Sequence, residues 1–136
     1  MDDEIRIPIA ADTDIVLARQ KGRELASQLG FSRTDLTFIA TAISEVARNI
    51  TSYAGRGEML FRIVDGDGRQ GILMEARDDG PGIDDLKQAL EDGYSTADGM
   101  GIGLPGARRL MDDFEVRSEA GAGTIVTMCK WARDRG

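Results

Sequence analysis

The chain has 136 residues, a formal net charge of −7 and a sequence pI of about 4.6. This length fits one domain over residues 1–136, and the acidic balance argues against a nucleic-acid partner and against an anionic membrane surface, since both need a basic face. The chain has no histidine and a single cysteine, Cys129, which excludes a histidine base, a phosphohistidine, an internal disulfide and a thiolate zinc site.

The first elements expected are a strand and a helix. Residues 4–9 alternate apolar and polar side chains, which is the period of a half-buried strand, and Pro8 indicates an edge position in the sheet. The apolar residues of 15–29 fall on one helical face, and either Asp12 or Thr13 is expected to cap this helix. A helix of this kind is predicted to pack its apolar face against the sheet.

The opposite face of this first helix is charged. It carries Arg19 and Arg23 among other polar side chains. The simplest interpretation is a solvated surface. The alternative is a partner-docking surface, with Arg19 and Arg23 as the contact residues.

A second helix is predicted over residues 34–53. Its apolar side chains recur with helical spacing, and Ser32 or Thr34 is expected to cap it. Glu45 and Asn49 are four residues apart, so they share one face. Taken alone, they would be ordinary exposed polar residues.

The pattern of the remaining sequence predicts a β-hairpin, then two helices, and then two further strands. A polar, glycine-containing turn over 65–70 separates two strands, and the second strand leads into Asp78. A polar segment over 93–103 is expected to be a mobile lid. The remaining predictions are strands over 59–64 and 71–77, a helix over 83–92, a helix over 104–111, and strands over 114–118 and 124–131. This order predicts an α/β sandwich with helices on one face of a single sheet.

Two glycine-rich turns bracket the polar segment, at 78–83 and 99–104. Glycine allows backbone N–H groups to approach a ligand closely, and a helix that begins just after such a turn favours anions. Each turn alone is a weak signal and fits a plain strand-to-helix connection. Residues 101–106 also match G-x-G-x-x-G, but they follow a polar segment and not a strand, so a dinucleotide-binding unit is rejected.

Four motifs in this order resemble the N, G1, G2 and G3 boxes of the GHKL ATPase superfamily. The motifs are Glu45-x-x-x-Asn49, Asp78-x-Gly80-x-Gly82, Gly99-x-Gly101-x-Gly103-Leu104 and Gly121-x-Gly123-Thr124. The sequence around them is similar to the serine/threonine switch kinases of bacterial stressosomes, an anti-sigma factor kinase-like group. The resemblance implies a Bergerat-type fold, an α/β (α+β) sandwich in which one mixed sheet is covered on one face by helices.

The same resemblance implies ATP and Mg²⁺ as ligands and assigns the site residues. Glu45 is implied to be the catalytic base, and Asn49 to hold the metal. Asp78 is implied to accept a hydrogen bond from the adenine amino group. The ATP-binding set implied is Asn49, Tyr53, Asp78, Gly80, Gly82, Ile83, Gly101, Gly103, Leu104 and Thr124.

The function expected is that of a protein serine/threonine kinase. A histidine kinase needs an acceptor histidine, and gyrase, Hsp90 and MutL need a second domain that this length does not hold. By resemblance, the substrates are STAS-domain scaffold proteins, and the kinase then engages a downstream enzyme such as a PP2C-type phosphatase. Two alternatives stay open: an anti-sigma factor kinase that binds a sigma factor directly, and a nucleotide-binding docking module with little catalysis. Without a signal-peptide pattern or an apolar run of about 18 residues, a soluble cytoplasmic protein is expected.

Overall fold

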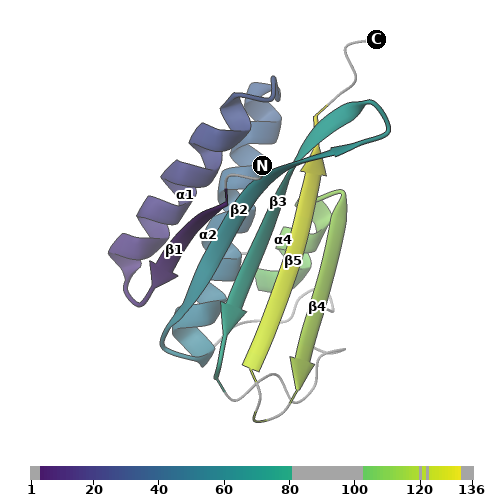
Figure 1. Ribbon diagram of the computed structural model, residues 1–136. Helices are drawn as coiled ribbons and strands as arrows, with labels where there is room; N and C mark the ends of the chain where they lie inside the picture. The colour runs from purple at the N-terminus through teal and green to yellow at the C-terminus, as the bar shows by residue number, and fades with distance from the viewer. Residues whose placement is uncertain (1–3, 81–102, 120, 122, 133–136) are drawn as a thin grey trace.

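A computed structural model describes residues 4–80, 103–119, 121 and 123–132 of the chain. A five-stranded sheet forms one layer, and the three described helices lie together against one of its faces (Figure 1). The elements in chain order are β1 (Ile5–Ile9), α1 (Asp12–Ser27), α2 (Arg33–Tyr53), β2 (Gly57–Gly66), β3 (Arg69–Asp78), α4 (Gly103–Leu110), β4 (Asp113–Glu119) and β5 (Gly123–Trp131). The predicted α/β sandwich is confirmed. The helix expected over 83–92 and most of the expected lid lie outside the described residues.

The strand order in the sheet is β1-β2-β3-β5-β4, and each neighbouring pair is antiparallel. The expectation of a mixed sheet was therefore wrong for these five strands. A parallel pair needs a crossover that returns the chain to the same end of the sheet. Here β2 and β3, and also β4 and β5, follow one another directly in the described chain, and a pair of helices connects β1 to β2. Pro8 lies in β1 at the sheet edge, as predicted.

The two long helices begin with different caps. Ser32 accepts a hydrogen bond from the backbone N–H of Asp35 at 3.1 Å, so the first of the two predicted caps for α2 is confirmed. At α1 neither Asp12 nor Thr13 is the cap. Instead, the carboxylate of Asp14 accepts from the backbone N–H groups of Ala10 and Ala11, at 2.9 and 3.0 Å, which ties the helix to the end of β1.

The β2–β3 hairpin is tighter than the predicted turn over 65–70. The strands continue to Gly66 and from Arg69, which leaves only Asp67 and Gly68 between them. These two residues have φ angles of 52° and 79°, as a two-residue type I′ turn requires. The ladder is longer for this reason, and the far end of β3 brings Asp78 to the end of the sheet opposite the hairpin.

The core lies between the sheet and the helices. Helix α2 contributes most to it, because its residues from Ile39 to Ile50 include ten that are buried. Burial of this apolar face is the main force that holds α2 on the sheet. Among the described residues, no helix is long and apolar enough to cross a membrane.

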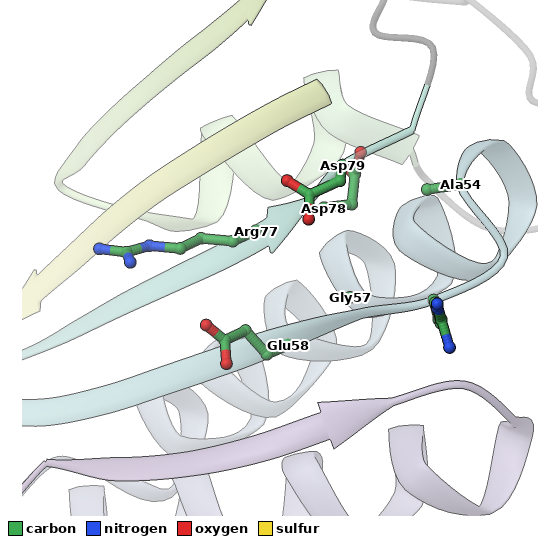
Figure 2. Close-up of a pocket in the computed structure, with 7 residues that line it drawn as sticks. Ala54, Gly57, Glu58, Arg77, Asp78 and Asp79 are labelled. Atoms are coloured by element: carbon green, nitrogen blue, oxygen red, sulfur yellow. The ribbon is translucent and has the colours of Figure 1, made fainter. Parts of the chain in front are cut away.

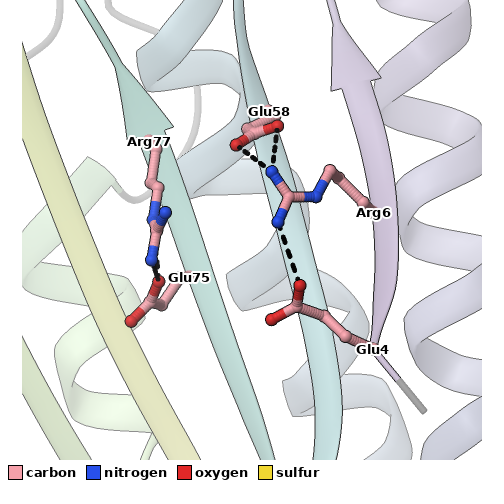
Figure 3. A network of polar contacts seen from close by, with 5 residues as sticks. All are labelled: Glu4, Arg6, Glu58, Glu75 and Arg77. Carbon is pink, nitrogen blue, oxygen red and sulfur yellow. Dashed lines mark hydrogen bonds and ion pairs between the residues drawn. The ribbon is translucent and has the colours of Figure 1, made fainter.

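The other face of the sheet has no described helix on it and carries charged side chains. Arg6 of β1 lies between Glu4 and Glu58, at 3.1 Å from each, and Arg77 of β3 pairs with Glu75 (Figure 3). The guanidinium of Arg6 has a raised pKa because of its hydrogen bond to Glu4 and the nearby charge of Glu58. Such solvent-facing pairs contribute little to stability. Their presence shows that this face of the sheet is a polar, solvent-facing surface.

Candidate functional site

The middle of α2 carries two buried polar side chains. Glu45 is 9% exposed and Asn49 is 8% exposed. Both lie within the run of apolar residues that faces the core, one helical turn apart. The interpretation as ordinary exposed residues is therefore wrong. A buried carboxylate is costly unless charged or polar groups surround it, so this position is built around its polar partners.

Glu45 has two such partners, one on each oxygen. Its Oε1 accepts a hydrogen bond from the backbone N–H of Gly103 at 2.9 Å, across 58 positions of sequence. Its Oε2 accepts from Nη1 of Arg48 at 2.7 Å, one turn along the same helix. An ionised carboxylate offers about four lone-pair sites. Each oxygen of Glu45 therefore keeps room for one more donor.

Gly103 is the first residue of α4 and has a φ of 66°, a left-handed conformation that favours glycine. Its N–H group lies at the positive end of the helix dipole and points at the Glu45 carboxylate. Leu104, the next residue, is buried in the core and fixes the start of the helix against α2. The structure thus brings together two motifs, the N box and the end of the G2 box, that the resemblance placed in one site.

Asn49 is the residue of α2 that the resemblance assigns to the metal. Its side chain is buried, and it lies on the face of α2 that also carries Glu45. An amide oxygen suits Mg²⁺, which takes few protein ligands when phosphates and waters supply the rest. The described residues contain no cluster of three or more His, Cys, Asp or Glu side chains that would hold a metal by themselves. Asn49 therefore fits a metal that is shared with a bound phosphate.

Asp78 ends β3 and forms the second part of the site. In the ladders it lies between Gly57 of β2 and Thr124 of β5. Its Oδ1 accepts from the backbone N–H of Gly80 at 2.9 Å. Burial raises the pKa of this carboxyl group, and the nearby Asp79 raises it further, against the opposing effect of backbone N–H groups of Gly80 and Thr124.

A cavity of about 600 Å³ opens beside Asp78 at this end of the sheet. Figure 2 shows Asp78 and Asp79 at the tip of β3, with Arg77 just before them on the same strand, Glu58 on the adjacent strand β2 and Ala54 where α2 ends. The lining residues are Ala54, Arg56, Gly57, Glu58, Arg77, Asp78 and Asp79. Glu45 and Asn49 are not among them. The cavity therefore adjoins the Asp78 end of the site and not the Glu45 end.

Position 80 needs glycine because the backbone there passes very close to Ala54 at the end of α2. A Cβ atom placed there would lie 2.5 Å from Cβ of Ala54 and 3.2 Å from Oδ1 of Asp78. The chain that leaves β3 thus passes directly over the end of α2. This contact links the G1 turn to the same helix that carries Glu45 and Asn49.

The remaining predicted site residues divide into three groups. Thr124 is buried, and its hydroxyl is 2.9 Å from that of Ser118; Tyr53 is the part-buried last residue of α2. Arg19 and Arg23 are exposed on α1. The members that lie outside the described residues are Gly82, Ile83 and Gly101.

Arg48 is the site residue that the motif analysis did not assign. Its place three residues after Glu45 on a predicted helix was the available signal, because residues at i and i+3 are neighbours on a helix. The pairing becomes significant only with the burial of Glu45, which the sequence pattern did not indicate.

Comparisons with known proteins agree with this arrangement. Residues 9–130 match the model of the histidine kinase-like ATPase domain. The chain is 48% identical over 133 residues to serine/threonine-protein kinase RsbT of Bacillus subtilis, covering 98% of this chain and 100% of that protein. It is 32% identical over 120 residues to an anti-sigma F factor of Caldanaerobacter subterraneus, covering 84% and 82% of the two chains.

Two solved structures share the fold. The RsbU and RsbW domains of a Mycobacterium tuberculosis protein align with a TM-score of 0.66 and 20% identity, over 98% of this chain and 33% of that one. A chain of the SiaB–SiaC complex from Pseudomonas aeruginosa aligns with a TM-score of 0.55 and 12% identity, over 95% and 89%. The family match covers most of the chain, and the resemblance drawn from the four motifs is confirmed. This chain belongs to the histidine kinase-like ATPase domain family, in its group of RsbT-like serine/threonine-protein kinases.

Proposed function

We propose that this protein transfers the γ-phosphoryl group of ATP to a serine or threonine of a partner protein, with Glu45 as the general base. The observation that carries this proposal is the buried carboxylate of Glu45, which faces the N-terminus of α4 one turn from Asn49. A carboxylate in such a place costs stability, and an apolar side chain would fill the position at lower cost. Its presence favours a role in chemistry.

The chemical step follows from the free lone pairs of Glu45. The acceptor hydroxyl gives its proton to the carboxylate as its oxygen bonds to the γ-phosphorus, and the bond from that phosphorus to the β-γ bridging oxygen breaks, which releases ADP. In this proposal, backbone N–H groups at the start of α4 would stabilise the negative charge of the phosphates. Mg²⁺, held by Asn49, would neutralise the phosphate oxygens.

The two ends of the site are held on one helix. Glu45 and the end of α2 at Ala54, where Gly80 crosses, are nine residues apart, which corresponds to about 13 Å of helical rise. That separation is on the scale of an extended nucleoside triphosphate. Asp78 would accept from the adenine amino group at one end while Glu45 acts at the other.

The proposed substrates are STAS-domain scaffold proteins, followed by engagement of a downstream enzyme such as a PP2C-type phosphatase. The similarity to RsbT over the whole chain supports this choice. The second candidate, an anti-sigma factor kinase that binds a sigma factor directly, is favoured by the similarity to anti-sigma F factors, at a lower identity. In either role we place the protein in the cytoplasm, where both ATP and these partners are found.

The test of the catalytic proposal is a phosphotransfer assay. Purified protein, Mg²⁺ and γ-labelled ATP are mixed with a STAS-domain scaffold protein, and label on serine or threonine is counted over time. We expect Glu45→Ala to keep its ATP affinity and to lose about 10²- to 10⁴-fold in rate, the usual contribution of a general base. Transfer by Glu45→Ala at the wild-type rate would show that this side chain has a structural role only.

A second experiment tests α1 as the docking surface. Arg19 and Arg23 lie on its exposed side near Val16, an apolar side chain that is 42% exposed. We expect Arg19→Glu and Arg23→Glu each to weaken binding of the scaffold protein while ATP affinity stays at the wild-type value. Lys21→Glu, which makes the same charge change elsewhere on α1, is the matched control. Equal scaffold binding by all three variants and the wild type would exclude this surface.

A further inference from the structure

The carboxylate of Glu45 is held from two directions by donors of different kinds. The N–H of Gly103 is a backbone group, fixed by the start of α4. The guanidinium of Arg48 is a side-chain group on α2 that is 37% exposed, while Glu45 itself is 9% exposed. With one donor on each oxygen, the carboxylate plane cannot turn freely about its terminal torsion.

The two donors also differ in what a bound nucleotide would do to them. Gly103 belongs to the turn that resembles a phosphate-binding loop, so its N–H is a donor that phosphate oxygens would compete for. Arg48 belongs to the continuous helix that carries Glu45, and its contact does not depend on the start of α4. A phosphate that takes the N–H of Gly103 would leave Arg48 as the described group that still orients the carboxylate.

We propose that Arg48 is a positioning residue of the kinase: it holds Oε2 of Glu45 so that Oε1 is presented to the acceptor hydroxyl. This inference rests on the proposed function, because it concerns the orientation of the base. The contact is short, at 2.7 Å, as expected for a charge-assisted hydrogen bond. Arg48 acts through Glu45 and is not placed in contact with the substrate.

The alternative is an ordinary helix-surface ion pair. Pairs at i and i+3 on exposed helix faces contribute little, and their loss leaves the geometry of neighbouring groups unchanged. The burial of Glu45 separates the two cases, since truncation of Arg48 would leave a buried carboxylate with one described donor instead of two. Loss of orientation at a reacting group has large effects on rate, because small displacements change the attack geometry.

The experiment compares Arg48→Ala and Arg48→Lys with the control Arg33→Ala, an exposed arginine at the start of the same helix. Phosphotransfer to the STAS-domain scaffold protein is measured at saturating ATP, and ATP affinity is measured separately by calorimetry. We expect Arg48→Ala to lower kcat about 10- to 100-fold while its Kd for ATP stays within about 2-fold of wild type. Arg48→Lys should recover part of the rate, and guanidinium ion added to the buffer should raise the rate of Arg48→Ala but not of Arg33→Ala.

A double-mutant cycle tests whether Arg48 acts through Glu45. In the Glu45→Gln background, Arg48→Ala should cause no further loss of kcat. A further loss equal to that of the single variant would overturn the inference. An unchanged kcat in Arg48→Ala would overturn it as well, and so would a fall in ATP affinity that accounts for the whole effect.

A measurement without phosphotransfer separates failure of this inference from failure of the proposed function. The amide signal of Gly103 in a ¹⁵N-correlated NMR spectrum of the nucleotide-free protein reports on the Glu45 contact. We expect Arg48→Ala to shift this signal and to speed its hydrogen exchange, while Arg33→Ala leaves both unchanged. If wild-type protein phosphorylates no acceptor, the proposed function fails and the role of Arg48 in catalysis fails with it. If wild-type protein is active and the Gly103 signal is the same in Arg48→Ala, only the positioning role is refuted.

Discussion

Replacement of Asp78 by asparagine tests the base-recognition end of the site. The carboxylate is half-buried at the end of β3 and is oriented by the N–H of Gly80. Asparagine is nearly the same size and retains one oxygen that can accept from Gly80. The change therefore removes the charge and one acceptor while it preserves the shape of the cavity.

The expected loss of ATP affinity follows from the kind of hydrogen bond that is removed. A hydrogen bond to a charged group is worth about 1.5–3 kcal/mol, which corresponds to about a 10- to 150-fold weaker Kd for Asp78→Asn. In the proposed site, the wild-type carboxylate would accept from the adenine amino group and would repel the carbonyl oxygen of guanine. Since the amide of asparagine can donate to that oxygen, the preference for ATP over GTP should fall in the variant.

The free energy of unfolding should fall as pH rises and Asp78 ionises, whereas ATP affinity should rise because binding uses the ionised carboxylate. Burial raises the pKa of Asp78 in the folded protein above its ordinary value of 3.8. The folded state therefore holds this proton more tightly than the unfolded state, so the stabilisation is complete below the ordinary value and is lost as pH rises through the folded pKa. Asp78→Asn lacks this titration, and its free energy of unfolding should fall less than that of wild type between acid and neutral pH.

Calorimetry with ATP and GTP, together with urea unfolding from pH 4 to pH 7, measures both effects. A variant that has merely unfolded would lose its cooperative transition as well as its nucleotide binding, so the two experiments separate misfolding from a specific loss. Equal affinity of the wild-type protein for ATP and GTP would refute the role of Asp78 in base selection. An unchanged pH dependence of stability would refute the argument from burial.

Three further predictions concern other parts of the chain. Asn49→Ala should lower ATP affinity about tenfold in calorimetry with Mg²⁺, the scale of one polar contact, and leave it unchanged in EDTA. A Cβ at Gly22 would lie 2.3 Å from Cδ1 of Ile43, so Gly22→Ala should destabilise the fold by about 1–3 kcal/mol in urea unfolding. Ile43→Val removes that atom, so the double variant should be more stable than the sum of the two single effects, whereas simple additivity would contradict the clash. Burial, with help from nearby Asp113, raises the pKa of the Cys129 thiol to about 11, so iodoacetamide should modify it about 100-fold more slowly at pH 8 than in urea.

Much of the fold could be predicted from periodicity and turn chemistry. The described helices and strands begin and end within a few residues of their predicted bounds. The shared face of Glu45 and Asn49 followed from their spacing on a helix. The burial of these two side chains could not be predicted in the same way, because periodicity shows on which side of a helix a residue lies but not which element packs against that side. The element that packs there is α4, whose first backbone N–H, that of Gly103, donates a hydrogen bond to Glu45 across 58 positions of sequence.

The cap of α1 and the antiparallel pairing of the strands were not predicted, for a related reason. Asp12, Thr13 and Asp14 are all plausible helix-start residues, and only the path of the chain out of β1 decides that Asp14 takes the backbone donors. The antiparallel order likewise depends on β5 lying between β3 and β4, which no local pattern encodes. Long-range pairing thus decided the features that short sequence windows left open.

The arrangement explains how one helix can hold both ends of the proposed nucleotide site. Helix α2 meets the start of α4 at Glu45 and the G1 turn at Ala54, so a single rigid element fixes both ends of the site. The spacing between the proposed base-recognition residue, Asp78, and the proposed general base, Glu45, then depends on helical rise, which side-chain motion does not change. The cost of this design is a buried carboxylate in the core, and Arg48 and Gly103 offset part of that cost by donating one hydrogen bond to each of its oxygens. Under the proposed function, this kinase receives its acceptor hydroxyl from another protein, and its base, Glu45, is already oriented before that partner arrives.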